Sequence, residues 1–206
     1  MKISNHPVIQ HKLSLLRDKD TPMYLFRTLI HEISILLTYE ASSSLAVKPK
    51  TIKTPLTSTN TSVLIQKQPI VIPILRAGLG MLDGFLSVFP HAKVGFIGMK
   101  RNETTYQSEH YYHNIPTDVE DRPVFLVDPM LATAGTATSA VNLLKQMKLE
   151  NIHMINIIAA PEGIKHFQNE HPDVVLTIAN IDEKLNQHAY ILPGLGDAGD
   201  RLYGTE

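Results

Sequence analysis

The chain has 206 residues, with 19 lysines and arginines against 20 aspartates and glutamates, so its formal net charge is −1. This near-neutral charge supplies no basic field of the kind that holds nucleic acid, so nucleic acid is not an expected partner and any anionic ligand must be bound by local groups. The chain contains no cysteine, which excludes disulfides, thiolate catalysis and thiolate zinc sites.

The length is enough for one large domain with a sizeable cleft, and we expect residues 1–206 to form a single domain. The start of the sequence, Met1-Lys-Ile-Ser-Asn-His-Pro, has no apolar signal core. No window approaches the roughly 18 apolar residues of a membrane span. We therefore expect a cytoplasmic protein with no membrane partner.

The first predicted element is an amphipathic helix that ends near Tyr39. Thr21 is expected to cap its start, with Pro22 in the first turn. Apolar residues then recur at helical spacing over about 18 residues. They are Leu25, Phe26, Leu29, Ile30, Ile33, Leu36 and Leu37.

The segment after this helix, from Ser42 to Lys67, has no clear periodicity. It mixes serine, threonine, lysine and proline. Such a composition favours extended edge structure or a surface arm over a place in the core.

From Ile70 onward, short apolar strands alternate with helical segments. This alternation predicts an α/β fold with a mostly parallel central sheet flanked by helices. Pro73 lies inside the first strand, where it donates no ladder hydrogen bond, so a bulge or local break is expected there. The predicted strands are Ile70 to Leu75, Lys93 to Gly98, Val124 to Val127, Ile152 to Ile158 and Val174 to Ala179, and the predicted helices are Leu79 to Val88, Thr136 to Met147 and Pro161 to Asn169.

Two long stretches carry no regular pattern. Residues Lys100 to Arg122 contain charges, three tyrosines and a proline, which indicates either a hairpin flap over a site or a disordered insert. The C-terminal run from Tyr190 to Glu206 holds four glycines. It is either a tightly folded loop that approaches a ligand by its backbone or a loose tail.

The most informative segment is the strand from Val124 to Val127, followed by Asp128 and a loop of small residues. Open α/β sheets bind ligands at the carboxyl ends of their strands, where Asp128 is expected to lie. The loop from Thr133 to Thr136 brings hydroxyl groups and backbone N–H groups to the start of a helix, whose dipole favours an anion. No Gly-Lys-Ser/Thr follows, so this is not a P-loop. The segment predicts a sugar-phosphate site, although Asp128 and the threonines could instead only cap a turn and a helix.

Two arginines are candidates for binding an anion. Arg76 follows a predicted strand and is expected at the same sheet edge as Asp128, where a guanidinium can bind two oxygens of a diphosphate. Arg101 opens the predicted flap and could close over the same anion. Taken alone, Arg76 fits a surface arginine on a turn better than a ligand-binding group, and Arg101 fits a solvated flap charge equally well.

Together these motifs resemble the uracil phosphoribosyltransferase family of type I phosphoribosyltransferases over nearly the whole chain. The most specific is Pro193-Gly-Leu-Gly-Asp-Ala-Gly-Asp200, because the wider superfamily shares the phosphate loop but not this segment. The other matching segments are His6-Pro, His11-Lys-Leu, Leu37-Thr-Tyr-Glu40, Pro73 to Gly84, Arg101-Asn-Glu103, Asp128 to Thr136, Ala159-Ala-Pro-Glu-Gly163 and Tyr190 to Thr205.

The resemblance implies a type I phosphoribosyltransferase fold, with a flap over about residues 100–122 and a C-terminal base-binding hood over about residues 180–206. It implies transfer of the phosphoribosyl group of 5-phospho-alpha-D-ribose 1-diphosphate (PRPP) to uracil, which gives UMP and diphosphate. Mg²⁺ is the implied cofactor, carried by the diphosphate and not by a site built from protein alone. A homo-oligomer, dimer or higher, is also expected.

The resemblance assigns roles to particular residues. Asp128, Arg101 and Asp197 would be catalytic. Backbone groups in the hood would read uracil, since its edge offers two carbonyls and an N–H; cytosine would present a donor where an acceptor is needed. The implied PRPP-binding residues are Arg76, Arg101, Asp128, Pro129, Met130, Leu131, Ala132, Thr133, Ala134, Gly135, Thr136 and Asp197, and the implied uracil-binding residues are Ile191, Gly196, Asp197 and Ala198.

The loop departs from the family pattern at Ala134, where glycine is usual. If this position has a left-handed backbone, alanine costs roughly 1–2 kcal/mol, which is about ten- to thirtyfold if the cost falls on binding. The expected consequence is weaker binding of the phosphoribosyl donor.

Three other functions were weighed against this one. A zinc site would need three or four converging ligands, but His31-Glu32 lacks a second histidine four residues on, and His110 and His113 lie in the flap. A non-catalytic sensor of uracil nucleotides is the stronger alternative, yet retention of Arg76, Asp128 and Asp197 favours chemistry. Transfer to a purine or to orotate depends on the base-binding loop alone.

Overall fold

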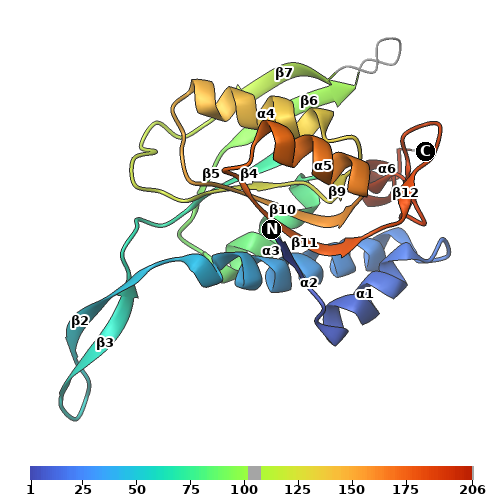
Figure 1. Cartoon of the computed structure of the whole chain (residues 1–206). Coiled ribbons are helices and arrows are strands. Elements are labelled where there is room, and N and C mark those ends of the chain that lie inside the picture. Colours follow the sequence, from blue (N-terminus) through green and yellow to red (C-terminus); the bar gives the residue numbers. More distant parts are fainter. Residues whose placement is uncertain (102–107, 206) are drawn as a thin grey trace.

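The computed structural model describes residues 1–101 and 108–205, apart from the side chains of Arg101 and Ser108. Within them, a nine-stranded sheet has the order β1-β11-β10-β8-β4-β6-β7, with β5 beside β4 and β9 beside β10. Helices cover both faces of this sheet, and a separate two-stranded arm projects from one side (Figure 1).

The first half of the chain forms β1 (Lys2–Ile3), α1 (Pro7–Arg17), α2 (Met23–Ala41), a 3-10 turn (Ser42–Ser44), β2 (Val47–Lys53), β3 (Ser58–Leu64), β4 (Ile70–Leu75), α3 (Leu79–Val88), β5 (Lys93–Val94) and β6 (Phe96–Arg101). The second half forms β7 (Ser108–Asn114), β8 (Val124–Val127), β9 (Met130–Leu131), α4 (Gly135–Gln146), β10 (Ile152–Ala159), α5 (Pro161–Glu170), β11 (Val175–Ile181), β12 (Lys184–Leu185), β13 (Ile191–Leu192) and α6 (Ala198–Tyr203).

The sheet is mostly parallel, as the alternation of strands and helices predicts. The neighbouring strands β11, β10, β8, β4 and β6 pair in parallel, whereas β7 pairs with β6 in antiparallel fashion. Because β4 and β8 run in the same direction, Arg76 and Asp128 follow them at one edge of the sheet.

The two faces of the sheet bury separate hydrophobic clusters. Helices α1, α2 and α3 lie on one face, and α4 and α5 lie on the other (Figure 1). Successive residues of β8 alternate between them: Phe125 and Val127 pack with the first group of helices, and Val124 and Leu126 with the second. Burial on both faces explains why the central strands are continuously apolar in sequence.

Several predicted elements have their predicted bounds, among them β4, β8 and α3. The predicted start of the helix that becomes α2 is wrong: Pro22 is at the N-cap position, and the helix begins at Met23. Thr21 donates its hydroxyl to the carbonyl of Leu15, 2.6 Å away, instead of capping α2. The last turn of α1 thus competes for this side chain.

Helix α1 was not predicted. His6 caps it, since its Nδ1 accepts a hydrogen bond of 3.2 Å from the N–H of Val8, and Pro7 opens the first turn. Its apolar stripe is short: Ile9, Leu13 and Leu16 are its buried residues.

The break expected at Pro73 is present. On one side, β4 pairs with β5 at Ile70 and Val71 and with β6 at Ile74 and Leu75, so this ladder is interrupted at Ile72 and Pro73. On its other side the ladder with β8 continues through Pro73, opposite Val127. Pro73 has no N–H to donate, and it lies where the ladder with β5 and β6 is interrupted and requires no bond.

The segments of irregular sequence adopt folded structures. Strands β2 and β3 form an antiparallel hairpin with mostly exposed residues, which is the predicted surface arm. Strands β6 and β7 form the hairpin flap; residues 102–107 of the predicted flap lie outside the described part. The C-terminal run forms β13 and α6. Among the described helices, none has the length and apolar character that a bilayer crossing requires.

Candidate active site

A cleft of about 640 Å³ opens at the carboxyl edge of the sheet. This volume suits a nucleotide-sized ligand. Residues from three predicted segments, the β4 end, the β8 end and the C-terminal run, contribute to one wall. The lining residues are Ile74, Leu75, Arg76, Ala77, Met99, Lys100, Tyr111, Asp128, Thr136, Tyr190, Asp197, Gly199 and Asp200.

Asp128 is anchored at the end of β8 by its backbone. Its N–H donates to the carbonyl of Ile155 at 3.2 Å, and its carbonyl accepts from Nδ2 of Asn156 at 2.8 Å. Asn156 is fully buried in the central strand β10. The main chain at Asp128 is therefore fixed by two neighbours, while its carboxyl group faces the cleft.

The environment of Asp128 disfavours its charge. Burial raises the pKa of its carboxyl group to about 7, and the negative charge of Asp197 adds to the increase, whereas a hydrogen bond with the backbone of Met130 opposes it. A carboxyl group with such a pKa at a cleft is typical of a functional site.

The predicted phosphate loop, residues Asp128 to Thr136, runs into the first turn of α4. Ala134, the residue before the helix, has φ 68° and ψ 0°, and no side chain caps the first turn. Of the first N–H groups of α4, that of Gly135 lies 3.5 Å from Thr133 Oγ1, at the outer limit of hydrogen bonding. The dipole of α4 makes this end of the helix suited to bind an anion. Thr136, in that first turn, lines the cleft. The sequence predicts a cost for alanine at position 134 if the backbone there is left-handed, and the backbone is left-handed.

Helix α5 packs directly on the back of this loop. A Cβ atom at Gly163 would lie 2.0 Å from the carbonyl oxygen of Ala132, so only glycine fits. The preceding residue, Glu162, accepts a hydrogen bond of 3.1 Å from the N–H of Leu185 in β12. Consecutive residues of one helix thus touch the phosphate loop and the C-terminal region.

Arg76 extends from the end of β4 into the cleft, and 58% of its side chain is exposed. Its guanidinium lies 3.5 Å from both Asp200 Oδ1 and Thr205 Oγ1, at the outer limit of hydrogen bonding. Its carbonyl accepts a hydrogen bond of 3.1 Å from the Tyr203 hydroxyl. The backbone is held while the guanidinium is only loosely paired, which suits an anion-binding side chain.

The predicted C-terminal hood, about residues 180–206, contains the β12–β13 pair and α6. Asp197 caps α6, since its Oδ1 accepts from the N–H of Asp200 at 3.0 Å. Gly194 and Gly196 have positive φ angles of 68° and 81°. At Gly194 a Cβ would lie 2.1 Å from the Ile191 carbonyl oxygen, so the tight turn requires glycine.

The structure brings four of the predicted site residues to one cleft: Arg76, Asp128, Thr136 and Asp197. The other predicted loop residues, from Pro129 to Gly135, are not among the lining residues and instead shape the loop. The backbone of Arg101 ends β6, but its side chain lies outside the described part. The predicted uracil residues Ile191, Gly196 and Ala198 do not line the cleft, although their chain neighbours Tyr190, Asp197 and Gly199 do.

Sequence reasoning missed four polar residues that line the cleft. They are Lys100, Tyr111, Tyr190 and Asp200. The available signals were weak: Lys100 adjoins a predicted arginine, and the flap tyrosines had no distinguishing spacing. Asp200 is the last residue of the motif from Pro193 to Asp200, but the motif alone does not show that Asp200 lines the cleft as Asp197 does.

Within residues 1–101 and 108–205, no group of three or more His, Asp or Glu side chains is placed to hold a metal ion. Asp128 and Asp197 nevertheless face one cleft and interact electrostatically. Mg²⁺ in proteins is usually held by one or two carboxylates together with substrate phosphates and water. The residues present therefore fit a Mg²⁺ ion that arrives with a diphosphate.

Comparison with known proteins gives the class and then the family. The chain superposes on adenine phosphoribosyltransferase from Trypanosoma brucei with a TM-score of 0.59 at 12% identity, covering 94% of this chain and 86% of the other. The chain thus has the phosphoribosyltransferase fold.

The particular family follows from closer relatives. A sequence model of the family described as uracil phosphoribosyltransferase matches residues 3–205. The uracil phosphoribosyltransferase of Finegoldia magna is 52% identical over 204 residues, which cover 99% of this chain and 98% of the relative. A solved protein from Aquifex aeolicus is 39% identical, with a TM-score of 0.93 over 99% of both chains. The chain belongs to the uracil phosphoribosyltransferase family.

Proposed function

We propose that this cleft transfers the phosphoribosyl group of PRPP to uracil, forming UMP and diphosphate in pyrimidine salvage. The observation that carries the proposal is the convergence of Arg76, Asp128, Thr136 and Asp197 on one cleft in a member of this family. The four residues come from the end of β4, the end of β8, the first turn of α4 and the N-cap of α6.

The donor is proposed to lie with its 5′-phosphate on the loop from Thr133 to Thr136. The first N–H groups of α4 and the hydroxyl of Thr136 would hold that phosphate. Arg76, together with Arg101 from the flap, would bind the diphosphate, whose oxygens match the guanidinium fork. Asp128 would accept hydrogen bonds from the ribose hydroxyls.

Catalysis is proposed to depend on charge placement and not on a covalent intermediate with the protein. As diphosphate leaves, positive charge develops at the anomeric carbon of the ribose. The ionised carboxylate of Asp128 would stabilise that charge, and the arginines would stabilise the charge on the leaving group. Because burial raises the pKa of Asp128 to about 7, we expect the rate to rise with pH toward that value.

Mg²⁺ is proposed as the cofactor, carried by the diphosphate, and Asp128 and Asp197 would contribute carboxylates from the cleft. When bound, it would neutralise phosphate charge and also the repulsion between the two carboxylates.

Uracil is proposed to be read by the hood backbone at Ile191, Gly196 and Ala198, beside Asp197. The positive φ at Gly196 turns the chain there, and an added Cβ would have only Arg201 Cδ nearby, at 3.5 Å. The absent side chain leaves the backbone open to close approach. A base that presents a donor in place of a uracil carbonyl would leave buried polar groups unpaired.

The test is turnover of radiolabelled uracil with PRPP and magnesium. We expect Asp128→Asn to lower kcat on the order of 10²- to 10³-fold, by analogy with the removal of other charge-stabilising groups. Asp173→Asn is the matched control, since its side chain is 61% exposed and pairs only with Lys145. An Asp128→Asn variant that kept more than half of the activity would disprove the role of Asp128.

The same assay separates the alternatives. A non-catalytic sensor would form no product, and a purine or orotate transferase would be revealed by competition with those bases. The cytoplasmic location and the homo-oligomer belong to this proposal as well, and cell fractionation tests the location.

A further inference from the structure

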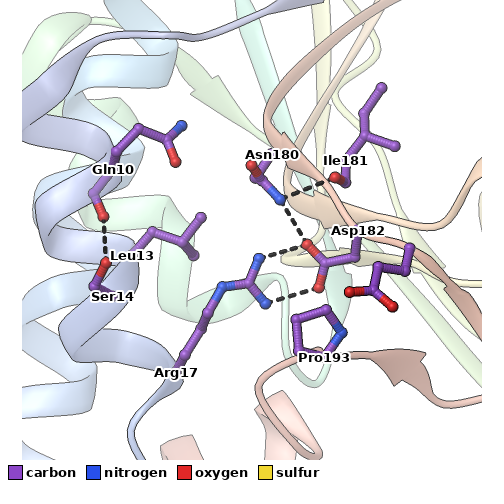
Figure 2. Close-up of a pocket in the computed structure, with 9 residues that line it drawn as sticks. Gln10, Leu13, Ser14, Arg17, Asn180, Ile181, Asp182 and Pro193 are labelled. Atoms are coloured by element: carbon purple, nitrogen blue, oxygen red, sulfur yellow. Dashed lines mark hydrogen bonds and ion pairs between the residues drawn. The ribbon is translucent and has the colours of Figure 1, made fainter.

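Helix α1 and the hood are joined by a buried ion pair between residues far apart in sequence. Arg17, the last residue of α1, forms a bidentate pair with Asp182, 165 positions later. Figure 2 shows the guanidinium of Arg17 directed at both carboxylate oxygens of Asp182. The side chain of Asp182 is fully buried and that of Arg17 is 20% exposed. Water therefore competes weakly with this pair, and breaking it would leave a buried charge.

Asp182 in turn holds the hood. Its Oδ2 accepts from the N–H of Gly194 at 2.9 Å, and its Oδ1 accepts from Nδ2 of Asn180 at 2.7 Å. Burial alone would raise the pKa of Asp182, but the hydrogen bonds from Arg17, Asn180 and Gly194 outweigh it and place the pKa below its ordinary value. The carboxylate is thus fully hydrogen-bonded in its charged form.

Arg17 also binds the hood directly. Its Nη1 donates to the carbonyl of Gly194 at 2.6 Å. Both backbone groups of Gly194 are therefore held, the N–H by Asp182 and the carbonyl by Arg17. Gly194 has a left-handed backbone and packs against the carbonyl of Ile191, the first of the proposed uracil-reading residues.

A second arginine, Arg201, also forms hydrogen bonds with both α1 and the hood. Nη1 of Arg201 donates to the carbonyls of Leu16 and Leu195 at 2.9 and 2.7 Å, and Nη2 donates to the carbonyl of Asp18 at 2.6 Å. The C-terminal end of α1 and the hood turn at Gly194 and Leu195 are thus joined by hydrogen bonds into one unit. None of these residues lines the active-site cleft.

We propose that Arg17 is a positioning residue for uracil: through Asp182 and Gly194 it sets the place of the hood backbone that reads the base. The inference rests on the proposed function, because it requires the hood to bind uracil. It predicts a larger defect for uracil than for PRPP: the hood carries Asp197, one of the implied PRPP-binding residues, but the phosphate loop and Arg76 belong to other strand ends. A purely structural role would instead weaken both substrates alike.

The test compares Michaelis constants for the two substrates in Arg17→Met. We expect the KM for uracil to rise about 10- to 100-fold and the KM for PRPP to change by less than about threefold, because small displacements of positioning groups have large effects on the group they position. Arg17→Lys should be intermediate, since lysine keeps the charge but not the bidentate geometry. Lys12→Met is the matched control. Lys12 lies on α1, as Arg17 does, and the substitution breaks its more exposed pair with Glu32 of α2, which is 2.6 Å long.

Circular dichroism establishes folding of each variant, and if Arg17→Met does not fold, Arg17→Lys and Asp182→Asn decide the question. An unchanged KM for uracil, or a parallel rise for both substrates, would overturn the inference while leaving the proposed function intact. Wild-type protein that forms no UMP would overturn the proposed function, and this inference with it.

Discussion

Asp128 combines a functional position with a cost to stability. Its pKa rises from 3.8 to about 7 on folding, chiefly through burial. The folded chain therefore retains a proton that the unfolded chain loses as pH rises from about 4 to 7, so the free energy of unfolding falls over that window.

This cost predicts a pH-dependent effect of Asp128→Asn on stability. Asparagine removes the ionisable group, so the variant should gain stability relative to the wild type between about pH 5 and pH 8, because only the wild type then buries a charge. Urea unfolding at both pH values measures the difference, and contributions from the histidines cancel in the comparison. A difference that does not change with pH would show that Asp128 has an ordinary pKa.

Ala134 raises a second question at the scale of one residue. Its left-handed backbone costs about 1–2 kcal/mol, but its methyl group is buried, which returns about 0.8 kcal/mol, and alanine restricts the unfolded chain more than glycine does. These contributions nearly cancel.

We therefore expect Ala134→Gly to change the free energy of unfolding by less than about 1 kcal/mol and the Kd of PRPP by less than about threefold. Calorimetric titration with PRPP and denaturant unfolding measure the two quantities. A donor affinity that improves tenfold would mean that the strain falls on binding, as the sequence comparison with the family suggested.

The sequence predicted the site residues that follow strand ends. It did not predict residues such as Arg17 and Asp182, which pair although they are far apart in the chain. Asp128 and Arg76 were found because an apolar strand followed by a polar residue marks the edge of a parallel sheet. Arg17 and Asp182 lie in segments with no motif, and their pairing depends on how α1 packs against β11. No local pattern encodes that contact.

Helix α5 illustrates how an element can support a site that it does not line. Gly163 has no room for a side chain beside Ala132, and the amphipathic pattern of α5 alone gives no reason to expect this glycine to be essential. Helix α1, by contrast, was missed because its apolar stripe is short and its N-cap is a histidine, which ranks below the common capping residues.

Gly163→Ala tests the support of the phosphate loop. The added methyl would displace the carbonyl of Ala132, so we expect a loss of roughly 1–3 kcal/mol in stability and weaker PRPP binding. Thermal unfolding and PRPP titration measure both. Gly135→Ala is a useful comparison, since a Cβ there would meet only Thr133 Oγ1, at 3.8 Å. Equal stability losses in the two variants would contradict the packing argument.

At the scale of the whole molecule, the two ends of the chain share a core. The hydrophobic cluster on one face of the sheet includes residues from Ile9 to Leu202. The mostly parallel fold was predictable because strands and helices alternate, but the closure of the chain ends onto each other was not, since it depends on contacts at long sequence separation.

The shared core supports the prediction that residues 1–206 form a single domain. We expect differential scanning calorimetry to give one heat-absorption peak, because separating the C-terminal hood from α1 would expose the same cluster that holds α2 and α3. Two well-separated peaks would show that the hood or the flap unfolds independently.

The proposed homo-oligomer is also tested at this scale. The exposed arm of β2 and β3 carries Val47, Ile52 and Leu56 into solvent, with Leu56 96% exposed. Light scattering after gel filtration should give at least twice the chain mass of 23.0 kDa. A monomer at micromolar concentration would remove the homo-oligomer from the proposal.

The first turn of α5 has a geometric consequence. Because Glu162 binds the N–H of Leu185 and Gly163 abuts Ala132, one turn of helix connects β12 with the loop that precedes α4. In the proposed binding mode, the separation of phosphate and base is thereby built into the backbone before any substrate enters. A nucleotide with a longer bridge between those two groups would have to break one of these contacts in order to bind.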